Sequence, residues 1–405
     1  MTTATVDSVA EGDRLARRNA RLLAVCQALA GGNSTVTITT GGIIGAMLAP
    51  EKGLATLPIS ALVFGMWVGT LPIGYLARTY GRRAAFQVGT VLGISGGLLS
   101  MLAVLRGSFG LLLVGTFCNG LYAAAHQAYR FAAADTASDA FKPKAVSWVM
   151  AGGVFAGVVG PQLVIWTKDL WQPYLFAATY LGQAGVALLV GGLLTGLRIP
   201  RPPRATGLNG GRPLIEIIST LRFITAAVAG AASYAMMNLV MTSAPLAMVA
   251  CDHSITDATL GLQWHVLAMY APSFFTGALA ARFGLMRVMV AGFFMTLLSA
   301  VVFMTGLSLA HFWIALILLG LGWNLSFIAA TTLVTQCHTG VERNKVQAFN
   351  DFLVFGSMAV ASFSSGNVLA HYGWQAVNAI VFPVVGVALV LIGIRALRER
   401  RIRPA

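Results

Sequence analysis

Hydrogen-bonding and ionisable side chains recur at helical spacing inside a long apolar stretch of the chain. Asn119, Tyr122 and His126 stand three and four residues apart, so they share one face of the helix predicted over residues 109–132. Histidine gains or loses a proton near neutral pH, and asparagine and tyrosine hydrogen-bond an uncharged solute. The stripe therefore predicts a solute-binding or proton-carrying surface. Hydrogen bonding to a neighbouring helix is the alternative for each residue.

Three further apolar stretches carry polar and aromatic side chains. Polar residues inside a membrane span are costly, and they tend to face a cavity. Aromatic rings stack on flat solutes and amides fix their orientation, so these side chains suit a flat, weakly charged organic solute. The predicted cavity residues are Gln27, Asn33, Thr37, Asn119, Tyr122, His126, Tyr234, Asn238, Trp323, Asn324 and Phe327.

The composition requires a lipid environment for the helices that carry these residues. Of 405 residues, 57% are hydrophobic and 10% are charged, whereas soluble domains have about a quarter charged residues. A membrane-spanning helix needs about 20 apolar residues. Twelve such helices are predicted, over residues 21–45, 55–77, 84–105, 109–132, 145–166, 173–197, 220–249, 258–281, 288–308, 312–335, 346–369 and 375–396.

The positions of lysine and arginine predict how these helices are oriented. Lys52, Arg106 and Lys168 fall in predicted outer turns, and every other lysine and arginine falls in a predicted inner segment or at the inner end of a predicted span. Cytoplasmic loops are enriched in positive charge, so we expect both termini in the cytoplasm. Because the charges sit in short loops, the net charge of +14 does not indicate a nucleic-acid surface. The first 20 residues are polar and lack a signal-peptide pattern.

A short basic turn occurs twice in the chain. Residues 74–83 read Gly-Tyr-Leu-Ala-Arg-Thr-Tyr-Gly-Arg-Arg, and residues 277–287 read Gly-Ala-Leu-Ala-Ala-Arg-Phe-Gly-Leu-Met-Arg. The two copies predict two homologous halves. The chain resembles the major facilitator superfamily of transporters, whose signature loop joins helices two and three and recurs in part between helices eight and nine. The predicted parts are a tail (1–20), a six-helix bundle (21–197), a cytoplasmic linker (198–219), a second six-helix bundle (220–397) and a tail (398–405).

The resemblance implies an all-α membrane fold of two pseudo-symmetric bundles, with helices one, four, seven and ten around a central cavity. It also implies an inner lock between the signature loop and the start of helix eleven, here Arg78 with Asp351. The alternative is that Arg78 only extends its charge to the membrane surface. The predicted gating or coupling residues are Arg78, Arg82, Arg83, His126, Arg130, His265 and Asp351.

The predicted spans have no aspartate or glutamate near their middle. Proton-driven drug antiporters of the superfamily commonly use a buried carboxylate with a raised pKa. Proton coupling would therefore rest on His126, His265 or Asp351, or be absent. A glycine-rich stretch that ends at Pro161 resembles the antiporter motif of helix five, and a close-packed helix seam is the alternative reading.

Together these patterns predict a transporter in the bacterial inner membrane. We expect it to move a small, weakly charged solute, aromatic or heterocyclic and vitamin-like or drug-like, by alternating access, with uptake or facilitated passage favoured. A proton-coupled efflux antiporter for drugs or metabolites is the alternative. An enzyme is disfavoured because no HExxH, GxSxG or P-loop pattern occurs. The expected partners are the solute, membrane lipid and protons or another coupling ion, for a monomer without cofactor, metal or nucleic acid.

Overall fold

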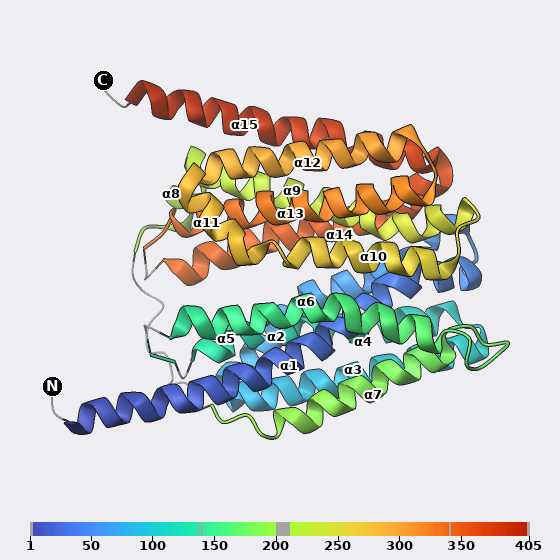
Figure 1. Ribbon diagram of the computed structural model, residues 1–405, viewed down its shortest axis with the longest axis horizontal. Coiled ribbons are helices and arrows are strands. Elements are labelled where there is room, and N and C mark those ends of the chain that lie inside the picture. Colours follow the sequence, from blue (N-terminus) through green and yellow to red (C-terminus); the bar gives the residue numbers. More distant parts are fainter. Residues whose placement is uncertain (1–2, 136, 139–140, 200–210, 340–341, 403–405) are drawn as a thin grey trace. The chain divides into compact units, whose positions relative to one another are not determined.

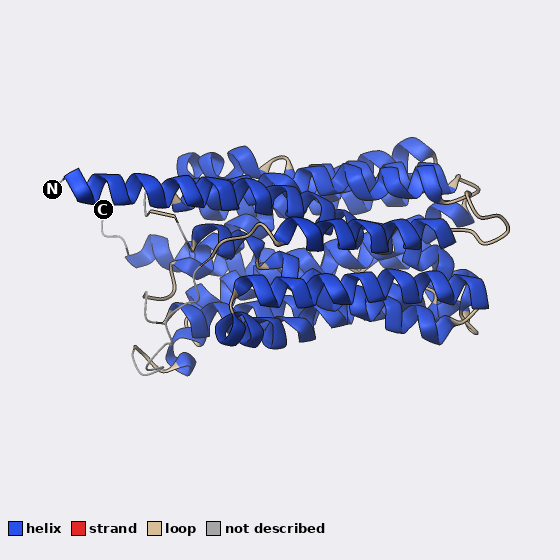
Figure 2. Ribbon diagram, turned by 90° about the horizontal axis from the view of Figure 1, so that it is seen from below, coloured by secondary structure: helices blue, strands red, loops and turns tan. Residues whose placement is uncertain are grey.

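The computed structural model describes residues 3–135, 137–138, 141–199, 211–339 and 342–402. All regular structure in these ranges is helical, which confirms the predicted all-α class (Figure 2). The chain divides into two compact units, each of which is described here by itself. Unit 1 comprises Met1–Pro50 and Leu57–Thr206, and unit 2 comprises Glu51–Thr56 and Gly207–Ala405.

Unit 1 consists of α-helices that follow one another along the chain (Figure 1). The longest, α1, has 46 residues and combines the predicted tail with the first predicted span. The helices are α1 (Thr3–Leu48), α2 (Leu57–Tyr80), α3 (Arg82–Arg106), α4 (Phe109–Gln127), α5 (Tyr129–Ala134), α6 (Lys142–Thr167) and α7 (Ala177–Leu194).

Unit 2 repeats this plan and adds a short 3-10 helix from between α1 and α2. The Thr56 hydroxyl accepts a hydrogen bond from the Ser365 hydroxyl at 3.2 Å, within this unit. The elements are η1 (Lys52–Leu54), α8 (Leu214–Ile218), α9 (Leu221–Ala250), α10 (Ile255–Tyr270), α11 (Ser273–Phe283), α12 (Leu285–Thr305), α13 (Leu309–Thr335), α14 (Arg343–Ala379) and α15 (Val381–Ile402).

Nine stretches of the described chain are long and apolar enough to cross a membrane. The last of them, Phe349–Arg398, contains the spans of both α14 and α15. Helix α1 is not among the nine because Gln27, Asn33 and several threonines lower its hydropathy. The predicted span at 258–281 is also missing, because the chain is broken there into α10 and α11. If α14 and α15 are counted separately, and α1 and the α10–α11 pair are added, the number of stretches equals the twelve spans predicted from the sequence.

Glycines allow helices within each unit to approach backbone to backbone. A Cβ on Gly120 of α4 would lie 2.1 Å from the Leu62 carbonyl oxygen of α2. A Cβ on Gly152 of α6 would lie 2.3 Å from the Ala24 carbonyl oxygen of α1. Small residues at such crossings permit close van der Waals packing in the membrane. The glycine-rich stretch of α6 therefore forms a packing seam with α1.

The repeated basic turn has the same backbone geometry in both units. Gly81 precedes α3 with a φ angle of 92°, and Gly284 precedes α12 with a φ angle of 86°. Both angles are in the region that glycine adopts without steric cost. The two turns thus place equivalent helices after equivalent residues, as expected for homologous halves.

Candidate functional site

Unit 2 contains a cluster of five aromatic rings drawn from four helices. Trp323 and Phe327 stand one turn apart on α13 and stack, with centroids 5.1 Å apart and planes 14° apart. Tyr234 of α9 meets them edge-on, at 5.2 Å and 5.0 Å. Phe355 of α14 lies 6.0 Å from Tyr234, and Tyr270 of α10 lies 6.1 Å from Trp323. We call these five residues the aromatic cluster.

The aromatic cluster keeps one hydrogen-bond donor unused. Trp323 is only 6% exposed, and its indole nitrogen has no hydrogen-bond partner among the described residues. Buried indole N–H groups usually find a partner. Tyr234 and Phe327 are half-buried, so neither residue is fully enclosed. The cluster therefore combines partly accessible aromatic residues with an unpaired donor, the combination that a flat heterocycle with carbonyl acceptors would use.

Three predicted cavity residues of unit 1 come together around Gln183 of α7. Its side-chain amide donates to the Asn33 carbonyl at 2.8 Å and to the Thr37 hydroxyl at 2.9 Å. The Asn33 side chain donates to the Gln183 carbonyl at 3.0 Å, and the Asn119 side chain donates to Oε1 of Gln183 at 3.4 Å. These bonds join α1, α4 and α7. They are the hydrogen bonds between neighbouring helices that the sequence left open as the alternative to a solute cavity. The side-chain oxygens of Asn33 and Asn119 have no partner among the described residues.

His126 lies on the predicted face of α4 and is 4% exposed. Its Nε2 is 3.1 Å from the Ser34 hydroxyl of α1, whereas Nδ1 has no hydrogen-bond partner in the described part of the chain. The rings of Tyr122 and Tyr129 flank it, with centroids 5.8 Å and 6.3 Å away. A buried histidine with one free nitrogen could bind a solute or carry a proton, so both roles stay predictions.

Gln27, the remaining predicted cavity residue of α1, is half-buried. Its place in a solute cavity stays a prediction.

The predicted amides of unit 2 hold helices together. Asn324 of α13 donates to the Met269 carbonyl at 2.6 Å and to the Ser273 hydroxyl at 2.7 Å, across the break between α10 and α11. The Thr276 hydroxyl donates back to the Asn324 side chain at 2.6 Å. Asn238 of α9 donates to the Met358 carbonyl of α14 at 3.3 Å. Their predicted place in a solute cavity is untested by these contacts.

His265 is a fully buried side chain of α10 that bonds to α13. Its Nδ1 is 2.7 Å from the Leu316 carbonyl oxygen, so Nδ1 carries the hydrogen. Its Nε2 has no partner among the described residues. The bond fixes the tautomer and the ring orientation, and a part in coupling stays a prediction.

The basic turn of unit 1 forms an ion pair within that unit. Arg82 Nε donates to Asp135, at the end of α5, at 3.0 Å. Arg83 and Asp351 are exposed, and the guanidinium of Arg130 lies 4.8 Å from the ring centre of Phe131. The side chain of Arg78 lies outside the described residues. The predicted lock between Arg78 and Asp351 therefore stays a prediction.

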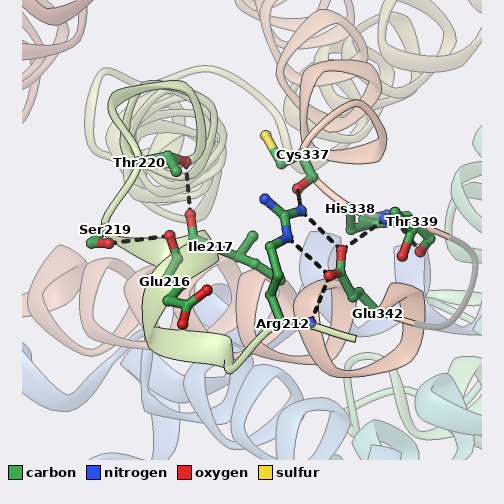
Figure 3. Close-up of polar contacts among 9 residues, drawn as sticks. All are labelled: Arg212, Glu216, Ile217, Ser219, Thr220, Cys337, His338, Thr339 and Glu342. Carbon is green, nitrogen blue, oxygen red and sulfur yellow. Dashed lines mark hydrogen bonds and ion pairs between the residues drawn. The ribbon is translucent and has the colours of Figure 1, made fainter. Parts of the chain in front are cut away.

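Figure 3 shows a charged contact that the sequence did not predict. Arg212, just before α8, binds the carboxylate of Glu342 through Nε and Nη2, each at 2.9 Å. The backbone amides of Arg212 and Thr339 also donate to this carboxylate at 2.9 Å. Arg212 Nη2 reaches the Cys337 carbonyl at 3.2 Å. The contact closes the loop between α13 and α14 onto the start of α8.

This contact shifts the titration of both partners. The Arg212 guanidinium holds the pKa of the Glu342 carboxyl well below its usual range, with help from the backbone donors. The Glu342 carboxylate raises the pKa of Arg212. Glu342 is 2% exposed, which its flanking charged residues do not suggest. The sequence also gave no periodic signal for Gln183, Tyr270 or Phe355; each becomes notable only through a partner on another helix.

Comparison with known proteins yields a single family. The model of the Major Facilitator Superfamily matches residues 23–261 and 226–405. The riboflavin transporter RfnT of Brucella anthropi is 46% identical over 378 residues, which cover 93% of this chain and 95% of that protein. The uncharacterized MFS-type transporter YddS of Bacillus subtilis is 26% identical and covers 98% of this chain and 95% of its own.

Solved structures share the fold. A D-xylose–proton symporter matches with a TM-score of 0.70 at 14% identity, over 92% of this chain and 96% of its own. A bacterial homologue of the human lysosomal transporter Spinster, inward-facing and unoccupied, matches with a TM-score of 0.71 at 13% identity, over 96% and 99% of the two chains. At these identities the likeness concerns the fold alone.

Proposed function

This chain belongs to the major facilitator superfamily and is a multi-pass membrane transporter of a small organic solute, and from that premise we propose that the solute is riboflavin. The aromatic cluster of unit 2 is the observation that carries the proposal. The similarity to a riboflavin transporter at 46% identity supports it. Isoalloxazine, the ring system of riboflavin, is flat, uncharged at neutral pH and rich in carbonyl and ring-nitrogen acceptors.

The chemistry of the aromatic cluster fits that ring system. Stacked and edge-on aromatic contacts each contribute about 0.5–1.5 kcal/mol beyond the area they bury. The free indole N–H of Trp323 would donate to a carbonyl oxygen of the flavin and so gain the partner it lacks. A neutral ring needs no countercharge, in agreement with predicted spans that have no central carboxylate.

We propose that transport proceeds by alternating access in the inner membrane, with uptake as the direction. Halves related by an internal repeat can rock about a central site, and the repeated turn at Gly81 and Gly284 supports such halves. Both termini are placed in the cytoplasm because the predicted inner segments hold nearly all lysines and arginines. Coupling to protons would rest on His126, whose Nδ1 is unpaired among the described residues.

The proposal is tested with purified protein in proteoliposomes. We expect riboflavin to enter in a saturable manner. Lumichrome, which has the tricyclic ring without the ribityl chain, should compete, whereas ribitol and D-xylose should not. Quenching of riboflavin fluorescence on stacking gives a second readout that requires binding alone. Competition by ribitol or D-xylose without competition by lumichrome would show that the protein recognises a polyol or sugar instead.

A further inference from the structure

Four arginines form a stripe on α1, just before its apolar part. Arg14, Arg17, Arg18 and Arg21 are spaced by three and four residues, so they share one face of the helix. All four are exposed, and together with Leu15 they line a hollow of about 660 Å³. None of them forms an ion pair with a described residue of the chain. We call this group the arginine stripe.

Neighbouring groups of unit 1 hold three of these guanidinium groups in place. The Arg17 guanidinium lies 5.4 Å from the ring centre of Phe141, and that of Arg21 lies 5.7 Å from the ring centre of Trp148. Cations at such distances are attracted by the ring faces. Arg18 Nη2 donates to the Gly196 carbonyl at 3.5 Å. These contacts orient three of the four guanidinium groups.

The part of α1 that lines the hollow carries positive charge only. The acidic residues of α1, Asp7, Glu11 and Asp13, all precede the stripe, and residues 14–50 contain no aspartate or glutamate. A guanidinium presents a planar fork of donors that matches phosphate oxygens, often in pairs. A hollow lined by four such groups fits a phosphate-bearing ligand.

Two observations place the stripe at the membrane surface. Trp148, which contacts Arg21, lies in the second turn of α6 (Lys142–Thr167), and tryptophan is enriched at membrane interfaces. Helix α1 has 46 residues, or about 69 Å at 1.5 Å per residue, against a hydrocarbon core of about 30 Å. Its N-terminal part extends past the other helices of unit 1 (Figures 1 and 2). A position at the depth of the lipid headgroups is what these two features indicate for the stripe.

We propose that the arginine stripe is a binding site for the phosphate of an anionic phospholipid headgroup, in the leaflet where α1 emerges. Juxtamembrane arginines attract anionic lipid, and the attraction grows with each arginine of a cluster. The ordered guanidinium groups and the hollow add a defined place for the headgroup. The site is separate from the aromatic cluster, so it stands or falls independently of the transported solute.

The test uses the purified full-length protein in detergent and short-chain lipids below their micelle concentration. Binding is measured by thermophoresis with dihexanoyl phosphatidylglycerol, dihexanoyl phosphatidylcholine and inorganic phosphate. We expect the phosphatidylglycerol to bind and the other two to bind at least about tenfold more weakly. A double variant that carries both Arg17→Gln and Arg21→Gln loses two guanidinium groups. Its binding of phosphatidylglycerol should be weaker by about tenfold or more. Arg106→Gln, at the exposed end of α3, is the control and should bind like the wild type.

Three results would overturn the proposal: equal affinity for the two lipids, phosphate binding as tight as lipid binding, or unchanged lipid binding in the double variant. If the double variant does not give a monodisperse protein, Arg17→Lys with Arg21→Lys replaces it. Lysine keeps the charge and the contact with the rings but loses the planar fork. Lipid affinity at the wild-type level in this lysine variant would overturn the proposal that guanidinium groups bind the phosphate.

Discussion

Glu342 and Arg212 are 130 residues apart in the chain and share a two-pronged ion pair, with both contacts at 2.9 Å (Figure 3). The carboxylate is 2% exposed although it lies in a loop. A buried charge that loses its partner is strongly destabilising, because its desolvation is no longer compensated. The pair therefore holds the start of α14 against the segment just before α8.

The first prediction concerns the stability of this pair and its dependence on pH. The pKa of the folded-state Glu342 carboxyl is lowered from the ordinary value of 4.5. Its contribution to stability is thus complete above that ordinary value, and it is lost as the pH falls towards the lowered value. We expect Glu342→Gln to lower the unfolding temperature at pH 7 and to differ less from the wild type at pH 3.5. Thermal unfolding in detergent at both values measures this.

Glu51→Gln is the control for this experiment, because Glu51 is exposed before η1 of the same unit and its side chain forms no cap hydrogen bond. Its unfolding temperature should follow that of the wild type at both pH values. An equal gap between Glu342→Gln and the wild type at pH 7 and pH 3.5 would contradict an ionic contribution from Glu342.

The second prediction concerns the aromatic cluster. Trp323→Ala removes a stacked ring and the free donor, and we expect riboflavin affinity to fall by about tenfold, since a loss of about 1.4 kcal/mol changes affinity tenfold. Trp323→Phe keeps a ring without the N–H, so its riboflavin affinity should lie between those of the wild type and Trp323→Ala. Trp166→Ala, at a residue 73% exposed on α6, serves as control. Fluorescence quenching measures binding, and undiminished quenching in Trp323→Ala would remove the cluster from the binding site.

The third prediction concerns coupling. His126→Gln keeps a polar side chain but cannot take up a proton near neutral pH. We expect this variant to retain downhill riboflavin exchange and to lose accumulation driven by a pH gradient across proteoliposomes. His371→Gln, at an exposed position on α14, should behave like the wild type. Normal gradient-driven accumulation in His126→Gln would shift the coupling role to another group, and a wild type indifferent to the gradient would favour facilitated passage.

The fourth prediction concerns the seam between α2 and α4. A Cβ on Gly120 would lie 2.1 Å from a backbone oxygen, and overpacking costs about 1–3 kcal/mol or more. We expect Gly120→Ala to lower the unfolding temperature and the yield of folded protein. Gly110, on the same helix, has open space around its Cβ position, so Gly110→Ala should be neutral or slightly stabilising. Equal behaviour of the two variants would argue against a backbone-to-backbone crossing.

The fifth prediction concerns topology. An alkaline phosphatase fusion after Arg204 should be inactive and a green fluorescent protein fusion there fluorescent, because we place this residue in the cytoplasm. A phosphatase inserted beside Asp169, between α6 and α7, should be active. The reverse pattern at either position would refute the proposed orientation.

The amino-acid sequence by itself determined the helical membrane class, the repeated turn and the residues of each polar stripe. These features depend on neighbours in the chain. Runs of apolar residues define spans, and a spacing of three or four puts Asn119, Tyr122 and His126 on one face. The glycines at 81 and 284 mark equivalent turns because each must adopt a positive φ angle.

Only the tertiary structure decided which partners these faces meet. The side-chain amide of Asn33 donates to the Gln183 carbonyl, 150 residues away, and the ring of Trp323 contacts Tyr270 of another helix. Glu342 meets Arg212, which reaches it from the segment just before α8. Helical periodicity fixes the direction of a side chain, but its neighbours depend on how closely small residues let distant helices approach. That distance is a property of the packed units, and no local spacing in the sequence encodes it.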